Sequence, residues 1–164
     1  MRRFFLSLLF LSLCSYLSAK ALFVYIEEKY DGESGVASAV REGIFDYLFN
    51  EGYIVFDDVK IDFRDNRIKT NSLGYIFFAA EEGGADFIIV LEIRSQLTKI
   101  DDRLQHITTS CNFFLYEVKT GKLLFKGTIN ENNDGREADT KIQELGFRIG
   151  KETALKIHRF LLHN

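Results

Sequence analysis

The sequence has no proline and no tryptophan, and its two cysteines are Cys14 and Cys111. If Cys14 is removed with an export signal, Cys111 is left alone and no intrachain disulfide can form. Stability must then come from a packed core, and 16 phenylalanines indicate a core rich in aromatic side chains. The chain also lacks a cluster of lysine and arginine, which argues against nucleic acid as a partner.

Residues 1–21 have the pattern of a cleavable secretory signal peptide. A short cationic start, Met1-Arg2-Arg3, precedes an apolar segment, 4–13, much shorter than the roughly 20 residues that span a bilayer. Two cleavage sites remain open, one after Ala19 and one after Ala21. Ala19-Lys20-Ala21 fits the preference for small residues at the first and third positions before the cut better than Leu17-Ser18-Ala19 does. The alternative is a signal anchor that is never cut.

Cys14 offers a different route to the envelope. Leu11-Ser12-Leu13-Cys14 resembles the lipobox of bacterial lipoproteins, although that motif has Gly or Ala where Leu13 stands. We expect a periplasmic protein without an acyl chain, beginning at Lys20 or Leu22. The alternative is a lipid anchor on Cys14, which would hold the domain against a membrane facing the periplasm.

Residues 22–164 are long enough for one ordinary domain with a single core. The formal net charge of −3 becomes −5 without Arg2 and Arg3, and −6 if Lys20 is removed as well. We therefore expect a mildly acidic exported domain that does not bind nucleic acid.

A buried strand and a long antiparallel hairpin organise the chain between residues 83 and 130. Five consecutive apolar residues, 87–91, indicate a strand covered on both faces, and from Leu91 onward apolar and polar residues alternate. A turn at Asp101-Asp102 leads to a second strand, 107–118. The tight turn Lys119-Thr120-Gly121-Lys122 leads to a third strand, 123–130.

The other elements are predicted around this hairpin. Strand 22–26 is an apolar run, and we expect it to lie beside 87–91 in the sheet. A helix with apolar residues from Val36 to Leu48 ends at Gly52. Strand 53–56 follows, joined to the first strand by a parallel crossover. A short helix, 72–82, stops at Gly83. The last helix starts with a capping box at Thr140. The order β-α-β-α-β-β-β-α predicts an α/β (α+β) domain with a single mixed sheet and a long C-terminal helix.

A resemblance follows from this order and from two motifs. Gly83-Gly84-Ala85-Asp86 before an apolar strand, and the segment 116–122 at the hairpin tip, are similar to bacterial envelope α/β domains. These are the amino-terminal domain of TolB, the penicillin-binding-protein activator LpoB and the curli secretion protein CsgG. The resemblance implies a non-catalytic module that docks on other envelope proteins, and it carries over no catalytic residues.

The candidate cofactor and metal motifs are incomplete, so we expect no cofactor. The turn 31–35 precedes a helix but lacks the glycine spacing of dinucleotide sites and the lysine of a P-loop. The acidic loop from Asp57 to Asp65 lacks the ligand pattern of an EF-hand, so we interpret it as solvated. His158 and His163 are five residues apart, outside the spacing that places two imidazoles on one helix face, and His106 lies in the hairpin.

Two interpretations of Cys111 are open: a thiol nucleophile whose partners come close in space, or an inward-facing strand residue. Its place in the alternating pattern with Phe113 favours the second. Gly146 and Gly150 form a Gly-x-x-x-Gly motif, which we expect to let the last helix approach the sheet closely.

The favoured function is therefore a non-catalytic, protein-binding adaptor or accessory module of the envelope. We expect its interface on one face of the hairpin, with Phe114 and Tyr116 as anchors beside Asn112 and Lys126. The alternative is a structural subunit of a larger assembly, such as a secretion channel or a flagellar periplasmic component. A small-ligand or enzymatic domain is third, and would need a deep pocket with converging polar groups.

Overall fold

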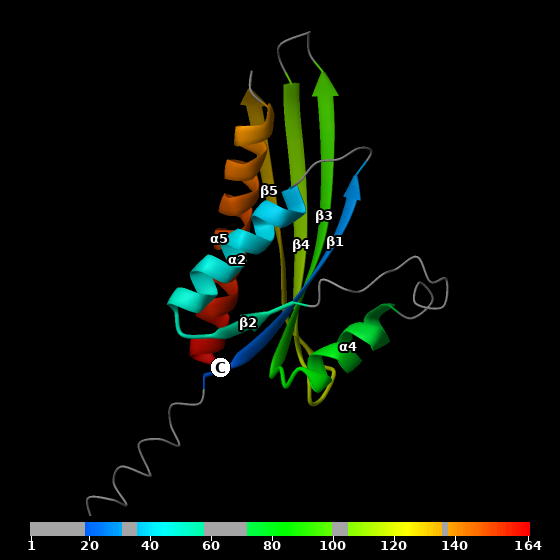
Figure 1. The fold of residues 1–164 in the computed structure, drawn as a ribbon, viewed down its shortest axis with the longest axis vertical. Helices are drawn as coiled ribbons and strands as arrows, with labels where there is room; N and C mark the ends of the chain where they lie inside the picture. Colours follow the sequence, from blue (N-terminus) through cyan, green and yellow to red (C-terminus); the bar gives the residue numbers. More distant parts are fainter. Residues whose placement is uncertain (1–18, 31–35, 58–71, 100–104, 136–137) are drawn as a thin grey trace, which may run out of the picture.

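The computed structural model describes residues 19–30, 36–57, 72–99, 105–135 and 138–164. They form one five-stranded mixed sheet with three helices in the predicted order (Figure 1). The strands are β1 (Ala21–Tyr30), β2 (Ile54–Phe56), β3 (Phe87–Lys99), β4 (Gln105–Glu117) and β5 (Leu123–Gly135). The helices are α2 (Val36–Asn50), α4 (Ser72–Glu82) and α5 (Ala138–His163). None of them, within the described residues, has both the length and the hydrophobicity that a bilayer crossing requires.

The strand order is β2-β1-β3-β4-β5. β1 pairs in parallel with both β2 and β3, whereas β3, β4 and β5 form an antiparallel meander. The prediction that the first strand lies beside the 87–91 run is confirmed by the register Leu22↔Phe87. Because parallel strands need a crossover, α2 connects β1 to β2 and α4 leads into β3.

The two faces of the sheet carry separate cores of unequal size. α2 and α5 cover one face, where alternate residues of β1, β3 and β4 such as Val24, Ile89 and Phe113 are buried. α4 lies on the other face near one end of the sheet, over Phe23 and Ile88 (Figure 1). Neighbouring residues of β3 thus enter different cores, which confirms that its apolar run is covered on both faces.

Helix α2 forms as its apolar spacing predicts. Val36, Val40, Ile44 and Leu48 are all fully buried against the sheet and α5. Gly52 ends the helix with a φ of 85°, since its N–H bonds to the carbonyl of Phe49 and the N–H of Tyr53 bonds to that of Leu48. This pair of bonds is a Schellman motif.

The Gly-x-x-x-Gly motif of α5 packs against α2. The prediction that this motif lets α5 approach the sheet closely is therefore wrong. A Cβ atom on Gly150 would overlap the carbonyl oxygen of Val40, and one on Gly146 would lie 2.6 Å from the Cβ of Ala39. A Cβ atom on Gly43 of α2 would likewise overlap the backbone of α5 at Phe147. The three glycines therefore let two helix backbones touch while the larger side chains of both helices reach the sheet.

Several predicted boundaries differ from the structure. α4 ends at Glu82 as predicted, but the glycine that terminates it with a positive φ, of 73°, is Gly84 instead of Gly83, and the N–H groups of Gly84 and Ala85 bond back to the last turn. β5 continues to Gly135, because β4 pairs with it through Gln105↔Gly135. α5 begins at Ala138, two residues before the predicted cap at Thr140.

Candidate protein-binding surface

The predicted interface residues lie on the sheet face opposite α5. On β4, Thr109, Cys111, Phe113 and Leu115 are buried toward α5, so the intervening residues face the other way. The antiparallel register places Asn112 beside Thr128 and Phe114 beside Lys126 on β5. The hydroxyl of Thr128 donates a hydrogen bond of 2.8 Å to Oδ1 of Asn112. Lys126 is exposed, whereas Phe114, Tyr116 and Asn112 are each partly buried.

Phe114 and Tyr116 contact the smaller core instead of standing free. Both rings pack against the buried cluster that includes Ile76 and Ala80 of α4 and Ile88 and Val90 of β3. Tyr116 makes an edge-to-face contact with Phe77, with ring centroids 5.6 Å apart. These two side chains thus help to hold α4 on the sheet, and only part of each ring is accessible to a partner.

The outer side of α4 carries aromatic side chains that are more accessible. Phe78 is 55% exposed and Tyr75 is 37% exposed. They are three residues apart and so neighbours on one helix face, while Ile76 and Ala80 are buried. Sequence reasoning missed this pair, although a signal exists: the run Tyr75 to Ala80 is apolar at every position, more than one helix face can bury.

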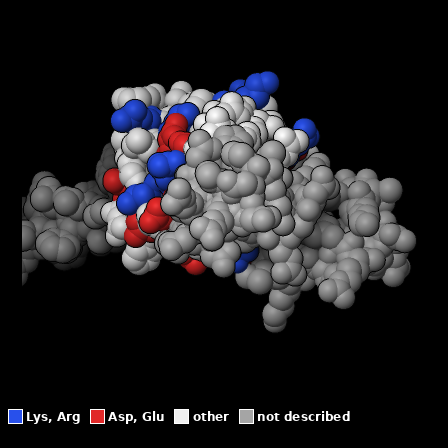
Figure 2. Space-filling model, turned by 90° about the horizontal axis from the view of Figure 1, so that it is seen from above, with Lys and Arg blue, Asp and Glu red and all other residues white. Residues whose placement is uncertain are grey.

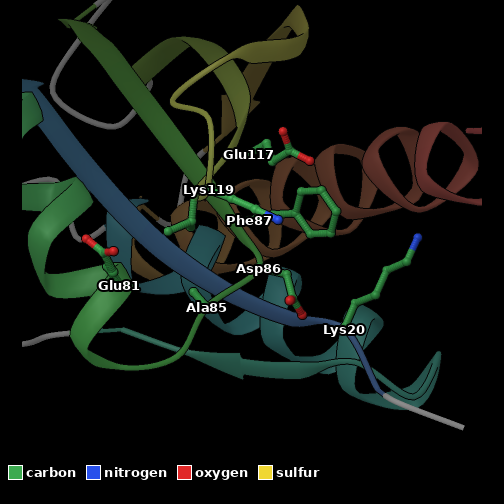
Figure 3. A pocket seen from close by; sticks show the side chains of 8 residues that line it. Lys20, Glu81, Ala85, Asp86, Phe87, Glu117 and Lys119 are labelled. Carbon is green, nitrogen blue, oxygen red and sulfur yellow. The ribbon is translucent and has the colours of Figure 1, made fainter. Parts of the chain in front are cut away.

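Two hollows flank the end of the sheet where β1 and β3 begin. The larger, of about 560 Å³, is lined by side chains of both signs, among them Lys20, Asp86, Glu117 and Lys119 (Figure 3). The smaller, of about 440 Å³, lies between Lys20, Leu123 and Phe160. The Asp86 carboxylate already accepts a 2.8 Å hydrogen bond from the Ala21 N–H.

Cys111 and His158, which the sequence offered as a possible nucleophile and a possible metal ligand, both make packing or hydrogen-bond contacts within the fold. Cys111 is fully buried, as predicted for an inward strand residue, and burial raises the pKa of its thiol to about 12. Nδ1 of His158 lies 3.1 Å from the Tyr53 hydroxyl, and its Nε2 lies 3.5 Å from a carboxylate oxygen of Glu51. These contacts join α5 to the turn after α2.

The remaining candidates form no metal site in the described part of the chain, where no group of three His, Cys, Asp or Glu side chains has a suitable arrangement. His163 is exposed at the end of α5. Asp57 pairs with Arg41 at 3.0 Å, and the rest of the acidic loop, like Cys14 and the turn 31–35, lies outside the described residues. In Figure 2, acidic and basic side chains are interspersed on the visible face.

Comparison with solved structures finds a similar fold in other bacterial proteins. Lipoprotein GNA1162 from Neisseria meningitidis aligns with a TM-score of 0.55 at 14% identity, over 87% of this chain and 99% of that one. The PelC dodecamer from Paraburkholderia phytofirmans aligns with a TM-score of 0.58 at 12% identity, over 84% of this chain and 88% of that one. At these identities the likeness is one of fold.

The LpoB C-terminal domain from Salmonella enterica aligns with a TM-score of 0.48 at 16% identity, over 70% of this chain and 83% of that one. A TM-score this low supports no conclusion about shared fold or function. The resemblance to TolB and CsgG stays a prediction. No protein-family profile and no curated protein sequence matches the chain. What the comparisons establish is that this chain has a fold that a bacterial lipoprotein also has.

Proposed function

We propose that the protein is an exported, non-catalytic module of the bacterial envelope that binds another envelope protein through α4 and the adjacent sheet face. The observation that carries this proposal is the aromatic pair Tyr75 and Phe78, exposed on the outer side of α4, the helix that packs over the core that Phe114 and Tyr116 contact. Protein interfaces commonly have such aromatic side chains at their centre with polar groups around them. Asn112, Thr128 and Lys126 supply polar groups on the same side of the sheet.

The charge of the surface fits a protein partner better than nucleic acid. Glu81 and Glu82 are exposed at the end of α4, close in sequence to Phe78, and the mature chain is acidic overall. A phosphate backbone would be repelled by this composition. A partner with a complementary apolar and basic surface would bury the aromatic pair and pair with the two carboxylates.

A paired substitution tests this interface. Replacing Tyr75 and Phe78 together with Ser should abolish capture of the partner, identified by in-cell crosslinking from position 78, while the melting temperature changes little. Leu162→Ser is a matched control, because Leu162 is 63% exposed at the far end of α5. Equal capture by the Tyr75/Phe78 variant and the wild type would contradict the proposed surface.

The second candidate is a subunit of a ring-shaped or channel-forming assembly. Its support is the fold shared with PelC, which was solved as a dodecamer, together with β5, a 13-residue strand at the edge of the sheet. Edge strands can pair with a further chain. The mass of the mature domain in solution separates the two functions: a monomer favours the adaptor, and a closed oligomer favours the subunit.

A further inference from the structure

We infer that the mature protein begins at Lys20, through cleavage after Ala19, although Ala21 offers the better sequence match for signal peptidase. This inference rests on the export signal of the proposed function and is independent of the proposed binding surface. Its basis is that Lys20 and Ala21 are built into the folded domain by contacts with three other elements.

The backbone of Lys20 and Ala21 continues the sheet. The carbonyl of Lys20 accepts a hydrogen bond of 3.1 Å from the N–H of Ile54, at the start of β2. The carbonyl of Ala21 accepts a bond of 2.8 Å from the N–H of Asp86, just before β3. The register pairs Ala21 of β1 with Ile54 of β2. Lys20 and Ala21 therefore make the first backbone hydrogen bonds between β1 and the chains on both sides of it.

Asp86 also holds Ala21 through its side chain. The carboxylate oxygen Oδ2 of Asp86 accepts the Ala21 N–H at 2.8 Å, and Figure 3 shows this side chain directed toward the beginning of β1. One residue therefore both donates to and accepts from Ala21. The carbonyl of Asp86 in turn accepts the N–H of Val118 at 3.0 Å, which ties this position to the end of β4.

The side chain of Lys20 closes the end of α5. Its Nζ donates a hydrogen bond of 3.2 Å to the carbonyl of Leu161, in the last turn of α5, and lies 5.7 Å from the centre of the Phe87 ring. Carbonyls in the last turn of a helix have no partner within the helix, and a cation there is favoured by the helix dipole. In Figure 3 the Lys20 side chain extends from the start of β1 toward α5.

Cleavage after Ala21 would remove every contact that Lys20 and Ala21 make. Ile54, Asp86 and Leu161 would each lose a partner, and the first strand would begin with a charged amino group at Leu22, a residue that is fully buried. Burying a charged group without a partner is costly. Cleavage after Ala19 leaves every contact intact and places the new amino group on Lys20, which is exposed.

The test is the intact mass of protein recovered from the periplasm of a bacterial host that expresses the full chain, 1–164. A mass beginning at Lys20 supports the inference, and a start at Leu22 or an acylated start at Cys14 overturns it. An uncut chain in the membrane fraction would overturn the inference alone, and an uncut chain in the cytoplasm would overturn the export proposal as well, so the two failures are distinguishable. Ala21→Val, which removes the small residue that only the second site needs, should leave the processing efficiency unchanged.

A second measurement compares the purified fragments 20–164 and 22–164. The shorter fragment should melt roughly 4 to 10 °C lower, or fail to fold. Asp86→Asn in the longer fragment is a control. Its amide oxygen can still accept the Ala21 N–H, so this variant should melt close to the parent fragment. Equal melting temperatures for the two fragments would show that Lys20 and Ala21 are dispensable, and would overturn the structural basis of the inference.

Discussion

The Cys111 side chain lies between the sheet and α5, where no solvent reaches it. Burial raises the pKa of its thiol to about 12, and the neighbouring Thr153 hydroxyl lowers it only in part. A thiol with such a pKa stays protonated at neutral pH, and the protonated form is a poor nucleophile and metal ligand. Its chemistry is therefore suppressed by its position in the core.

This pKa predicts how stability depends on pH. In the unfolded chain the thiol returns to its ordinary pKa of about 9, so between pH 9 and 12 the unfolded state has lost a proton that the folded state keeps. The free energy of unfolding should then fall as pH rises, by up to about 1.4 kcal/mol per pH unit from this group. Urea unfolding of wild type and Cys111→Ala at pH 8 and pH 10.5 measures it. The variant should lose less stability, and equal losses would contradict the pKa.

A second residue-scale prediction concerns the contact between α2 and α5. Gly150→Ala should destabilise the domain by about 1–3 kcal/mol, because the added methyl group would overlap the carbonyl oxygen of Val40. On an exposed helix position the same change is stabilising by up to about 1 kcal/mol. Denaturant unfolding, with the exposed α5 substitution Glu144→Ala as a control, checks the result. A variant as stable as wild type would mean that the helices separate at little cost.

Side-chain burial was predictable wherever one periodicity governs it. The alternation in β4 predicted an inward Cys111, and the helical spacing in α2 predicted a buried Ile44. The contact partner of Gly150 was not predictable, since a small residue indicates a close approach without indicating what approaches. The partial burial of Phe114 and Tyr116 likewise depends on where α4 lies.

The helices and strands follow from local patterns, but their ends depend on neighbours. Residues 131–135 of β5 are Glu-Asn-Asn-Asp-Gly, a composition typical of a loop, yet they pair with β4 across the hairpin. A partner strand can thus extend a strand that its own residues disfavour. For α4 the difficulty is the reverse, because an apolar residue at each position from 75 to 80 does not indicate which side faces the sheet.

At the scale of elements, the core shared by the sheet, α2 and α5 predicts the effect of two truncations. Ile44 on α2 and Ile89 on β3 are both fully buried in the larger core. Replacing either with Ala removes three carbon atoms from a packed interior, so each change should cost about 2–5 kcal/mol. Thermal unfolding of the two variants gives the measurement. Near-wild-type melting of both would mean that this core is not packed as described.

The whole molecule is asymmetric, with a large core under α2 and α5 and a small one under α4. Among the described residues, α5 buries five apolar side chains from Leu145 to Leu161, whereas α4 buries two, Ile76 and Ala80. The proposed binding surface lies on the less stabilised side. Surfaces that adapt to partners are often drawn from the least stable part of a structure.

This asymmetry predicts that α4 opens before the other two helices. Amide hydrogens of 72–82 should exchange with solvent faster than those in the middle of α5, by on the order of ten-fold or more, because opening α4 exposes far less apolar surface. Hydrogen exchange followed by mass spectrometry measures this, with α2 as an internal control because it buries six residues over a similar length. Opening of α4 would uncover the Phe114 and Tyr116 rings that pack with its core residues. Partner binding through the outer side of α4 should then slow exchange in 72–82 while leaving α2 unchanged, and a partner that protected α2 instead would place the interface on the opposite face of the sheet.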